Sequence, residues 1–353
     1  MTASPFDHPF LAPLFGDEDI AEAFSAAITL RRFRDFEIAL AHAQASEGII
    51  PSELAHKVIV ALTRFEPTMS DLADGVSSDG LVVPAYVRAA RLHMGPELAA
   101  GFHQGVTSQD LIDTALVQAI GSINGILSER LQVVSNSLAL LAARYGQNKL
   151  MGRTRMQAAL PITVGDRLVT WTAPIAALTE QLSLLLPRLM VLQLGGPSGD
   201  RQWLGERGDA VAARLARALD LGNPQRAWHT TRSEIANYAN WLSLVTGALG
   251  KIGQDMCLMA QNEFGEIAFS SGGQSSAMPH KQNPVHAEAM VTLARFNGTH
   301  LSGMHHALLH EQERSGSAWA LEWMILPQMA VAAGAATRRA RDAIHSVSRM
   351  GQS

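Results

Sequence analysis

The chain has 353 residues, of which 47% are hydrophobic, 17% are charged and 6% are aromatic. This length is enough for one large core or two domains. The formal charge of −4 gives no sign of a nucleic-acid-binding or membrane-binding surface, so local cationic groups must capture any anionic ligand. The single cysteine, Cys257, excludes a disulfide framework and fits a reducing cytosol.

No targeting segment is expected at the start of the chain. Residues 1–16 lack the basic start and uninterrupted apolar core of a secretory signal. The most apolar runs, residues 182–196 and 324–337, are too short or too interrupted to cross a bilayer. We therefore expect a soluble, cytoplasmic protein.

Apolar residues at helical spacing predict a group of helices at the start of the chain. Asp17 is a favourable N-cap for a helix that runs to about Ser46. A glycine-proline pair at residues 95–96 ends this unit, so we expect an N-terminal helical domain over residues 1–96. Its shorter helices are expected near residues 52–64, 69–76 and 84–94.

The rest of the chain, residues 97–353, is expected to form a central domain built from long helices. Residues 108–145 have no internal proline and predict a helix roughly 55 Å long at 1.5 Å per residue. Thr231 and Glu234 predict a capping box for a later helix that ends near residue 262. The other long helices are expected at residues 161–194, with kinks at Pro174 and Pro187, and at 284–309 and 318–346. Their wide apolar stripes carry few charges, so we expect them to pack against other copies in a homo-oligomer.

Three polar clusters interrupt these helical patterns. The first cluster, residues 102–114, places His103 before Thr107 and Ser108 at the predicted start of a helix. Thr107 or Ser108 fits a helix cap, and the same hydroxyls at a helix N-terminus also suit a carboxylate ligand. The second cluster, residues 151–165, carries two arginines, a threonine and a glutamine, which fit either a solvated connector or bidentate carboxylate binding.

The third cluster, residues 270–284, combines glycines, serines, a lysine and an asparagine in a predicted loop. Asn283 as N-cap and Pro284 as the first helical residue would explain the end of this loop structurally. They do not explain Ser275, Ser276 or Lys281. A hydroxyl beside an ammonium group and a helix N-terminus indicates anion chemistry.

Outside these three clusters, the polar residues His305, His306, His310 and Glu311 could suggest a metal site. The helix-borne zinc motif would need a second histidine where this chain has Arg314, and the chain offers no cysteine partners. We therefore expect no metal here.

The run Ser275-Ser276-Ala277-Met278-Pro279-His280-Lys281-Gln282-Asn283-Pro284 closely resembles the signature loop of the fumarase/aspartase superfamily. His103 with residues 107–110 is similar to the first shared region of the superfamily, and residues 154–165 are similar to the second. This resemblance spans essentially the whole chain. It implies an all-α long-helix bundle, a homotetramer whose core is formed by the central helices, active sites shared among three subunits, and no cofactor. The chain is short for the superfamily and is expected to lack most of its small C-terminal helical domain.

Within the superfamily, residues 152–157 and 310–319 resemble the bacterial 3-carboxy-cis,cis-muconate cycloisomerases. The resemblance implies an intramolecular lyase that acts on a small tricarboxylate in protocatechuate catabolism. It assigns proton transfer to Ser275 and charge stabilisation to Lys281 and Asn283, with Glu288 in support. The substrate-binding residues that it implies are His103, Thr107, Ser108, Thr154, Arg155, Gln157, Ser276, Met278 and Arg232.

Two positions depart from the superfamily pattern. Gln274 replaces the usual glycine before the paired serines, and Arg155 replaces the histidine of most lyases in the second region. In a lactone-opening reaction the departing group is a carboxylate with a pKa of ~4, so it leaves without a proton. An arginine that binds carboxylate is then more useful than a general acid. The alternatives are a fumarate-releasing lyase, such as adenylosuccinate lyase, and a non-catalytic crystallin-like relative.

Overall fold

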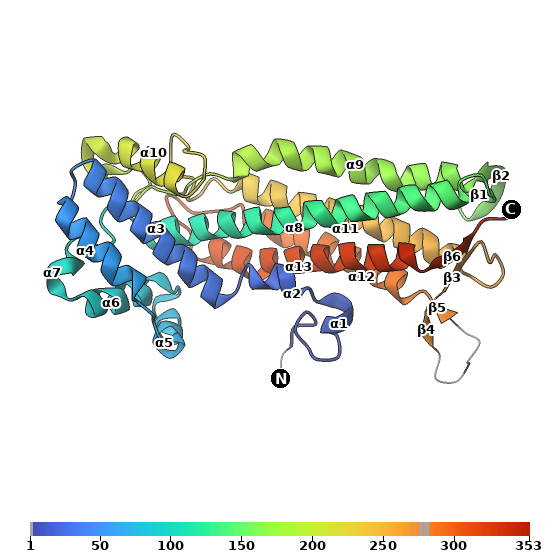
Figure 1. Cartoon of the computed structure of the whole chain (residues 1–353), viewed down its shortest axis with the longest axis horizontal. Coiled ribbons are helices and arrows are strands. Elements are labelled where there is room, and N and C mark those ends of the chain that lie inside the picture. Colours follow the sequence, from blue (N-terminus) through green and yellow to red (C-terminus); the bar gives the residue numbers. More distant parts are fainter. Residues whose placement is uncertain (1–2, 271, 275–277, 279–281) are drawn as a thin grey trace.

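A computed structural model of the chain describes residues 3–270, 272–274, 278 and 282–353. The chain is 66% helical, and the strands of its described part form three two-stranded sheets. Long helices run side by side along the molecule, and shorter helices gather at one end (Figure 1). The predicted all-α long-helix fold is therefore confirmed.

The short helices come mainly from the first hundred residues. The single helix expected from residue 17 to 46 is wrong, because the chain breaks at residues 23–25 into two separately capped helices. Asp17 accepts a hydrogen bond from the Ile20 amide at 3.1 Å, and Ser25 accepts one from the Ile28 amide at 3.3 Å. The helices are α1 (Ala12–Phe15), α2 (Glu18–Glu22), α3 (Ala26–Ser46), α4 (Ser52–Thr63), α5 (Met69–Asp79), α6 (Val83–Met94) and α7 (Pro96–Ala99).

In the described part of the chain, five long helices form the main bundle, and they run side by side (Figure 1). They are α8 (Ser108–Tyr145), α9 (Val164–Leu189), α11 (Ser233–Met259), α12 (Val285–His306) and α13 (Ser317–His345). The boundaries of α8 match the sequence prediction. A short 3₁₀ segment, η1 (Gln202–Arg207), and α10 (Gly208–Ala218) pack near α3 at the end of the bundle where α8 begins.

Two predicted helix starts are wrong. Residues preceding α9 form a hairpin of β1 (Lys149–Thr154) and β2 (Gln157–Thr163), so Pro161 lies in a strand and the helix begins at Val164. Thr163 and Asp166 form its capping box, and the helix runs on through both of its prolines. The capping box expected at Thr231 does not form. Instead, α11 begins at Ser233 and Glu234 pairs with Arg188.

The two remaining sheets lie at the end of the bundle opposite the short helices (Figure 1). Strand β3 (Ile267–Phe269) pairs with β6 (Val347–Met350), and β4 (Gly273–Gln274) pairs with β5 (Gln282–Asn283), both antiparallel. Asn283 is therefore a strand residue and not the expected N-cap of α12. That position is occupied by Pro284, which makes no side-chain cap.

The buried apolar residues form two cores. The larger core lies between the long helices and includes Ile123, Leu242 and Met290, each essentially inaccessible to solvent. The smaller core joins α3–α6 to the start of α8 and to residues 192–216. The smaller core thus draws on both sides of residue 96, and the division at that residue stays a prediction.

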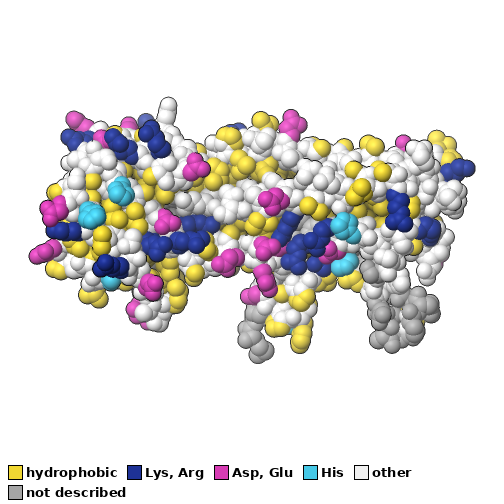
Figure 2. All heavy atoms as spheres, viewed as in Figure 1, with side chains coloured by type: hydrophobic (Ala, Val, Ile, Leu, Met, Phe, Trp, Pro, Cys, Tyr) yellow, Lys and Arg dark blue, Asp and Glu magenta, His cyan; other side chains and the backbone are white. Residues whose placement is uncertain are grey.

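Helix α8 is the one helix of the described residues that is long and apolar enough to cross a membrane by length and composition. In its most apolar window, 56% is buried inside the fold, as expected for the core helix of a soluble protein. Apolar side chains nevertheless remain exposed along the bundle, and some line its upper edge over α9 (Figure 2). Exposed examples are Val133, Leu140, Val169, Leu184 and Leu244.

Candidate active site

The first cluster is organised by Asp110, a fully buried carboxylate in the first turn of α8. Its Oδ2 accepts from the amides of Thr107 and Gly196, both at 2.9 Å. Its Oδ1 accepts from the Gly195 amide at 2.9 Å and lies 2.8 Å from His229 Nε2. This carboxylate therefore holds the glycine loop at 195–196 against the N-terminus of α8, and Thr107 and Ser108 lie beside that loop.

A residue that the sequence did not single out for function, Arg314, lies at this site. Its Nη1 donates to Thr107 Oγ1 at 2.7 Å, and its Nη2 donates to the carbonyls of Gly196 and Pro197 at 3.2 and 3.1 Å. An exposed guanidinium thus lies next to a hydroxyl and a helix N-terminus, which is a favourable place for a carboxylate. The signal in the sequence is that Arg314 lies in the 310–319 segment, which resembles the cycloisomerases as a segment and assigns Arg314 no role of its own.

His103 occupies a strained position beside the first cluster. Its φ of 58° lies in the left-handed region, and its Nδ1 is 2.5 Å from Oε1 of the buried Glu37. Gln44 on the same helix donates to the Gln104 carbonyl at 2.7 Å. Helix α3 therefore fixes the loop that carries His103, which leaves the imidazole Nε2 directed away from this pairing.

Arg232 lies in a buried ionic cluster and not on an open surface. Its side chain is 1% exposed, and it binds Asp113 at 2.6 and 3.1 Å and Glu322 at 2.9 and 2.5 Å. Burial alone would lower the pKa of Arg232, but the two carboxylates outweigh it and raise the pKa above its ordinary value. His310 is also buried here, 3.6 Å from Glu322. The guanidinium is therefore occupied by protein carboxylates, and Arg232 joins α8, α11 and α13.

The second cluster forms the tip of the β1–β2 hairpin. Thr154 pairs with Gln157, so the turn consists of Arg155 and Met156 alone. Both have positive φ, 49° and 67°, as in the tight hairpin turns that favour asparagine and glycine. Residues with side chains pay roughly 1–2 kcal/mol for such a conformation, and strain of this kind concentrates at functional sites. The residues of the tip, 154–157, are exposed, and Arg155 and Met156 line a cavity together with residues of α9 and α11.

The third cluster begins and ends in the β4–β5 ladder, where Gly273 pairs with Asn283. Ser275, Ser276 and Lys281 lie outside the described residues. A cavity of about 460 Å³ lies beside the ladder. It is lined in part by Cys257, Asn262, Met278, Asn283 and Glu288. Its described polar lining groups are side-chain amides and the Glu288 carboxylate, which is exposed in the first turn of α12.

One chain does not bring the three clusters together. The first cluster lies at the N-terminal end of α8 and the second follows its C-terminal end, and the whole helix has 38 residues, about 57 Å at 1.5 Å per residue. The second and third clusters lie at the same end of the bundle (Figure 1). A site that uses all three must take the first cluster from another copy.

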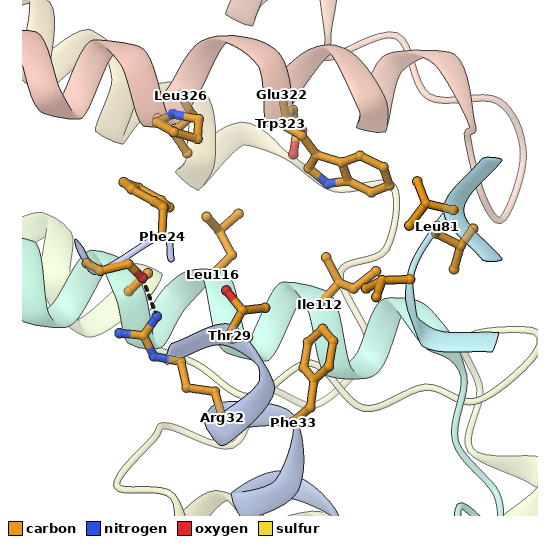
Figure 3. Close-up of a pocket in the computed structure, with 16 residues that line it drawn as sticks. Phe24, Thr29, Arg32, Phe33, Leu81, Ile112, Leu116, Glu322, Trp323 and Leu326 are labelled. Atoms are coloured by element: carbon orange, nitrogen blue, oxygen red, sulfur yellow. Dashed lines mark hydrogen bonds between the residues drawn. The ribbon is translucent and has the colours of Figure 1, made fainter. Parts of the chain in front are cut away.

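An apolar cavity of about 320 Å³ between α3, α8 and α13 is a poor match for a tricarboxylate (Figure 3). Its charged lining groups are already engaged, since Arg32 donates to the Ala23 carbonyl at 2.6 Å and Glu322 binds Arg232. Burial, with a contribution from Arg31, lowers the pKa of Arg32. None of the predicted substrate-binding side chains is among the described residues that line it.

Metal ligation has no support in the part of the chain that the structure describes. No group of three or more histidine, cysteine, aspartate or glutamate side chains there could hold an ion.

A family model described as lyase matches residues 18–296. The chain belongs to this lyase family. The 3-carboxy-cis,cis-muconate cycloisomerase of Pseudomonas aeruginosa is 36% identical over 329 residues, which cover 90% of this chain and 70% of that relative. The solved 3-carboxy-cis,cis-muconate lactonizing enzyme from Pseudomonas putida has a TM-score of 0.89 at 33% identity, over 97% of this chain and 77% of that one. The fumarate lyase from Mesorhizobium sp. BNC1 has a TM-score of 0.88 at 34% identity, over 95% of this chain and 76% of that one.

These comparisons confirm the resemblance to the fumarase/aspartase superfamily and to its cycloisomerase members. They do not assign roles to individual residues of this lyase, so the predicted catalytic and substrate-binding residues stay predictions.

Proposed function

We propose that the chain is an intramolecular lyase that interconverts 3-carboxy-cis,cis-muconate and 4-carboxymuconolactone. The observation that carries this proposal is Arg155, held at the tip of a strained hairpin where most lyases of the superfamily have histidine. The similarity to cycloisomerases at 32–36% identity over most of the chain supports the same activity.

The leaving group explains why arginine fits this position. When the lactone opens, a carboxylate departs, and its conjugate acid has a pKa of ~4, so it needs no proton at neutral pH. A guanidinium binds that carboxylate through two parallel hydrogen bonds without transferring a proton. Lyases that expel an amine or hydroxide need an acid instead.

The remaining roles follow from the clusters. In the lactonising direction, one carboxylate adds to the ring-closing carbon while charge moves into an adjacent carboxyl group as an enediolate, and a proton is delivered to carbon. Ser275 delivers that proton, and Lys281 and Asn283 stabilise the enediolate charge; removing such a donor typically costs about 3–4 kcal/mol.

The first cluster binds the other end of the substrate. Thr107, Ser108 and Arg314 form a carboxylate site at the N-terminus of α8, and His103 lies beside it. Arg232 supports this site from below through its buried carboxylate partners and does not touch substrate. Thr154, Gln157, Ser276 and Met278 complete the binding surface.

The assembly that we propose is a cytoplasmic homotetramer in which each active site takes its clusters from three subunits. Two observations support it: the length of α8 between the first and second clusters, and the exposed apolar side chains on α8, α9 and α11. No cofactor enters the proposed chemistry.

One spectrophotometric assay separates the proposed activity from its alternatives. Purified protein should remove the conjugated absorbance of 3-carboxy-cis,cis-muconate and should leave adenylosuccinate unchanged. Fumarate release from adenylosuccinate, with muconate untouched, would identify a fumarate-releasing lyase. Inertness toward both substrates would favour a non-catalytic relative.

A further inference from the structure

A cavity of about 640 Å³ lies beneath the β1–β2 hairpin, between the start of α9 and the end of α11. Four cationic side chains and two carboxylates line it, so it is locally positive in a chain whose formal charge is −4. The cationic residues are Arg153, Arg155, Arg167 and Lys251, and the acidic residues are Asp255 and Glu266.

Two of these cations are neutralised within the protein. Arg153 Nη1 lies 2.5 Å from Glu266 Oε1, and its guanidinium stacks 4.3 Å from the centre of the Phe264 ring. Lys251 pairs with Asp255 and donates to Thr170 at 3.1 Å. The excess positive charge of the cavity therefore resides on Arg155 and Arg167.

The guanidinium groups of Arg155 and Arg167 have no hydrogen-bond or ion-pair partner among the described residues, although the Arg167 carbonyl accepts from Thr170 Oγ1 at 2.7 Å. Arg155 is held over the cavity by the positive-φ turn. Arg167 is the fourth residue of α9, where the helix dipole is positive and a cation is disfavoured. A strained turn and a cation at a helix N-terminus thus lie at the same cavity. This pattern is typical of a binding site, where interactions with the ligand offset such local costs.

We propose that Arg155 and Arg167 together form a carboxylate subsite in this cavity, with Arg167 as a further substrate-binding residue. The inference rests on the proposed function for the identity of the substrate, a small tricarboxylate. Each guanidinium offers a planar fork that matches a carboxylate, and the amides at the start of α9 add a favourable dipole. If each guanidinium binds one carboxylate of the substrate, the third carboxylate is left to bind at the other clusters.

The test compares Arg167→Gln with Arg217→Gln, which makes the same charge change on an exposed face of α10, away from the cavity. Titration calorimetry with tricarballylate measures binding without turnover. Loss of a charge-assisted hydrogen bond should weaken tricarballylate binding about ten- to hundred-fold in Arg167→Gln and leave it unchanged in Arg217→Gln. The KM for carboxymuconate should rise by a similar factor, with kcat changed only a few-fold.

A purely structural role for Arg167 predicts a different result. The thermal unfolding midpoint would then fall, whereas removal of a cation from the first turn of a helix should leave it unchanged or raise it slightly. Wild-type affinity for tricarballylate in Arg167→Gln, an equal loss in Arg217→Gln, or no binding by the wild type would each overturn the subsite. If the wild type binds tricarballylate through Arg167 but does not convert carboxymuconate, the subsite stands and the proposed function fails.

Discussion

At the scale of single residues, the hairpin turn shows a position where the backbone conformation conflicts with the side chain it carries. Met156 is 70% exposed and has a φ of 67°, so its side chain contributes little burial and imposes strain. The sequence could not reveal this, because an Arg-Met pair is atypical of a two-residue turn that favours Asn-Gly.

Met156→Gly should therefore stabilise the protein by about 0.5–1 kcal/mol, since glycine adopts positive φ without penalty. Urea unfolding followed by circular dichroism measures the change. The control is Met151→Gly, which places glycine in the extended strand β1 and should destabilise by a similar amount. A loss of stability in Met156→Gly would show that the turn is not strained.

The thiol pKa of Cys257 responds to the negative charge of Glu288 beside the third cluster. Burial raises the pKa of its thiol to about 11, and the nearby Glu288 carboxylate contributes to the rise. Because the thiolate is the reactive form, alkylation by iodoacetamide should be slow at pH 8 and should accelerate about tenfold per pH unit up to pH ~11.

Glu288→Gln removes the negative charge and should lower the pKa of Cys257, so alkylation at pH 9 becomes faster. Mass spectrometry reads the result at the one cysteine of the sequence. Glu263→Gln, an equal charge change on an exposed neighbouring residue, should leave the rate unchanged. An unaltered pH profile in Glu288→Gln would mean that burial alone sets the thiol pKa.

At the scale of elements, the buried cluster around Arg232 joins the starts of three long helices. Asp113 on α8 accepts from Arg232, from Trp319 at 3.1 Å and from Gln109 at 3.0 Å. The family resemblance implied that Arg232 binds substrate, but the sequence could not indicate that two carboxylates distant in sequence surround it. The structural role of Arg232 follows from its burial between two carboxylates, which its position in the sequence does not reveal.

Arg232→Ala should cost about 3–5 kcal/mol, because it leaves two buried carboxylates without a counter-charge. The urea midpoint, measured at a fixed protein concentration, should fall accordingly. Arg188→Ala breaks the pair with Glu234 on a side chain that is 69% exposed, and should cost less than about 1 kcal/mol. Equal effects of the two substitutions would contradict the structural role of Arg232.

Helix periodicity predicted the long elements well and their boundaries unevenly. Residues 108–145 were placed correctly because no proline or glycine pair interrupts the pattern. Periodicity does not predict the hairpin at residues 149–163, because its strands carry no alternating apolar pattern and β2 is largely exposed. Pro161 fits the first position of a helix, but it lies in strand β2, opposite Met151 of β1.

At the scale of the whole molecule, sequence similarity identified the family and three clusters, and the structure explains why they cannot cooperate within one chain. The first and second clusters lie at opposite ends of α8, a 38-residue helix. Periodicity indicated an oligomer, and the family resemblance implied active sites shared among subunits. The length of α8 between the first two clusters supports that prediction.

Mixing two inactive variants tests this arrangement most directly. Arg314→Ala damages the first cluster and Arg155→Ala damages the second, and each protein alone should be nearly inactive on carboxymuconate. When the two are dissociated together and reassembled, about one quarter of the sites in a randomly mixed oligomer should take both clusters undamaged from different chains. Recovery of about a quarter of wild-type activity is the predicted result. No activity beyond that of the separate variants would contradict a site shared between subunits.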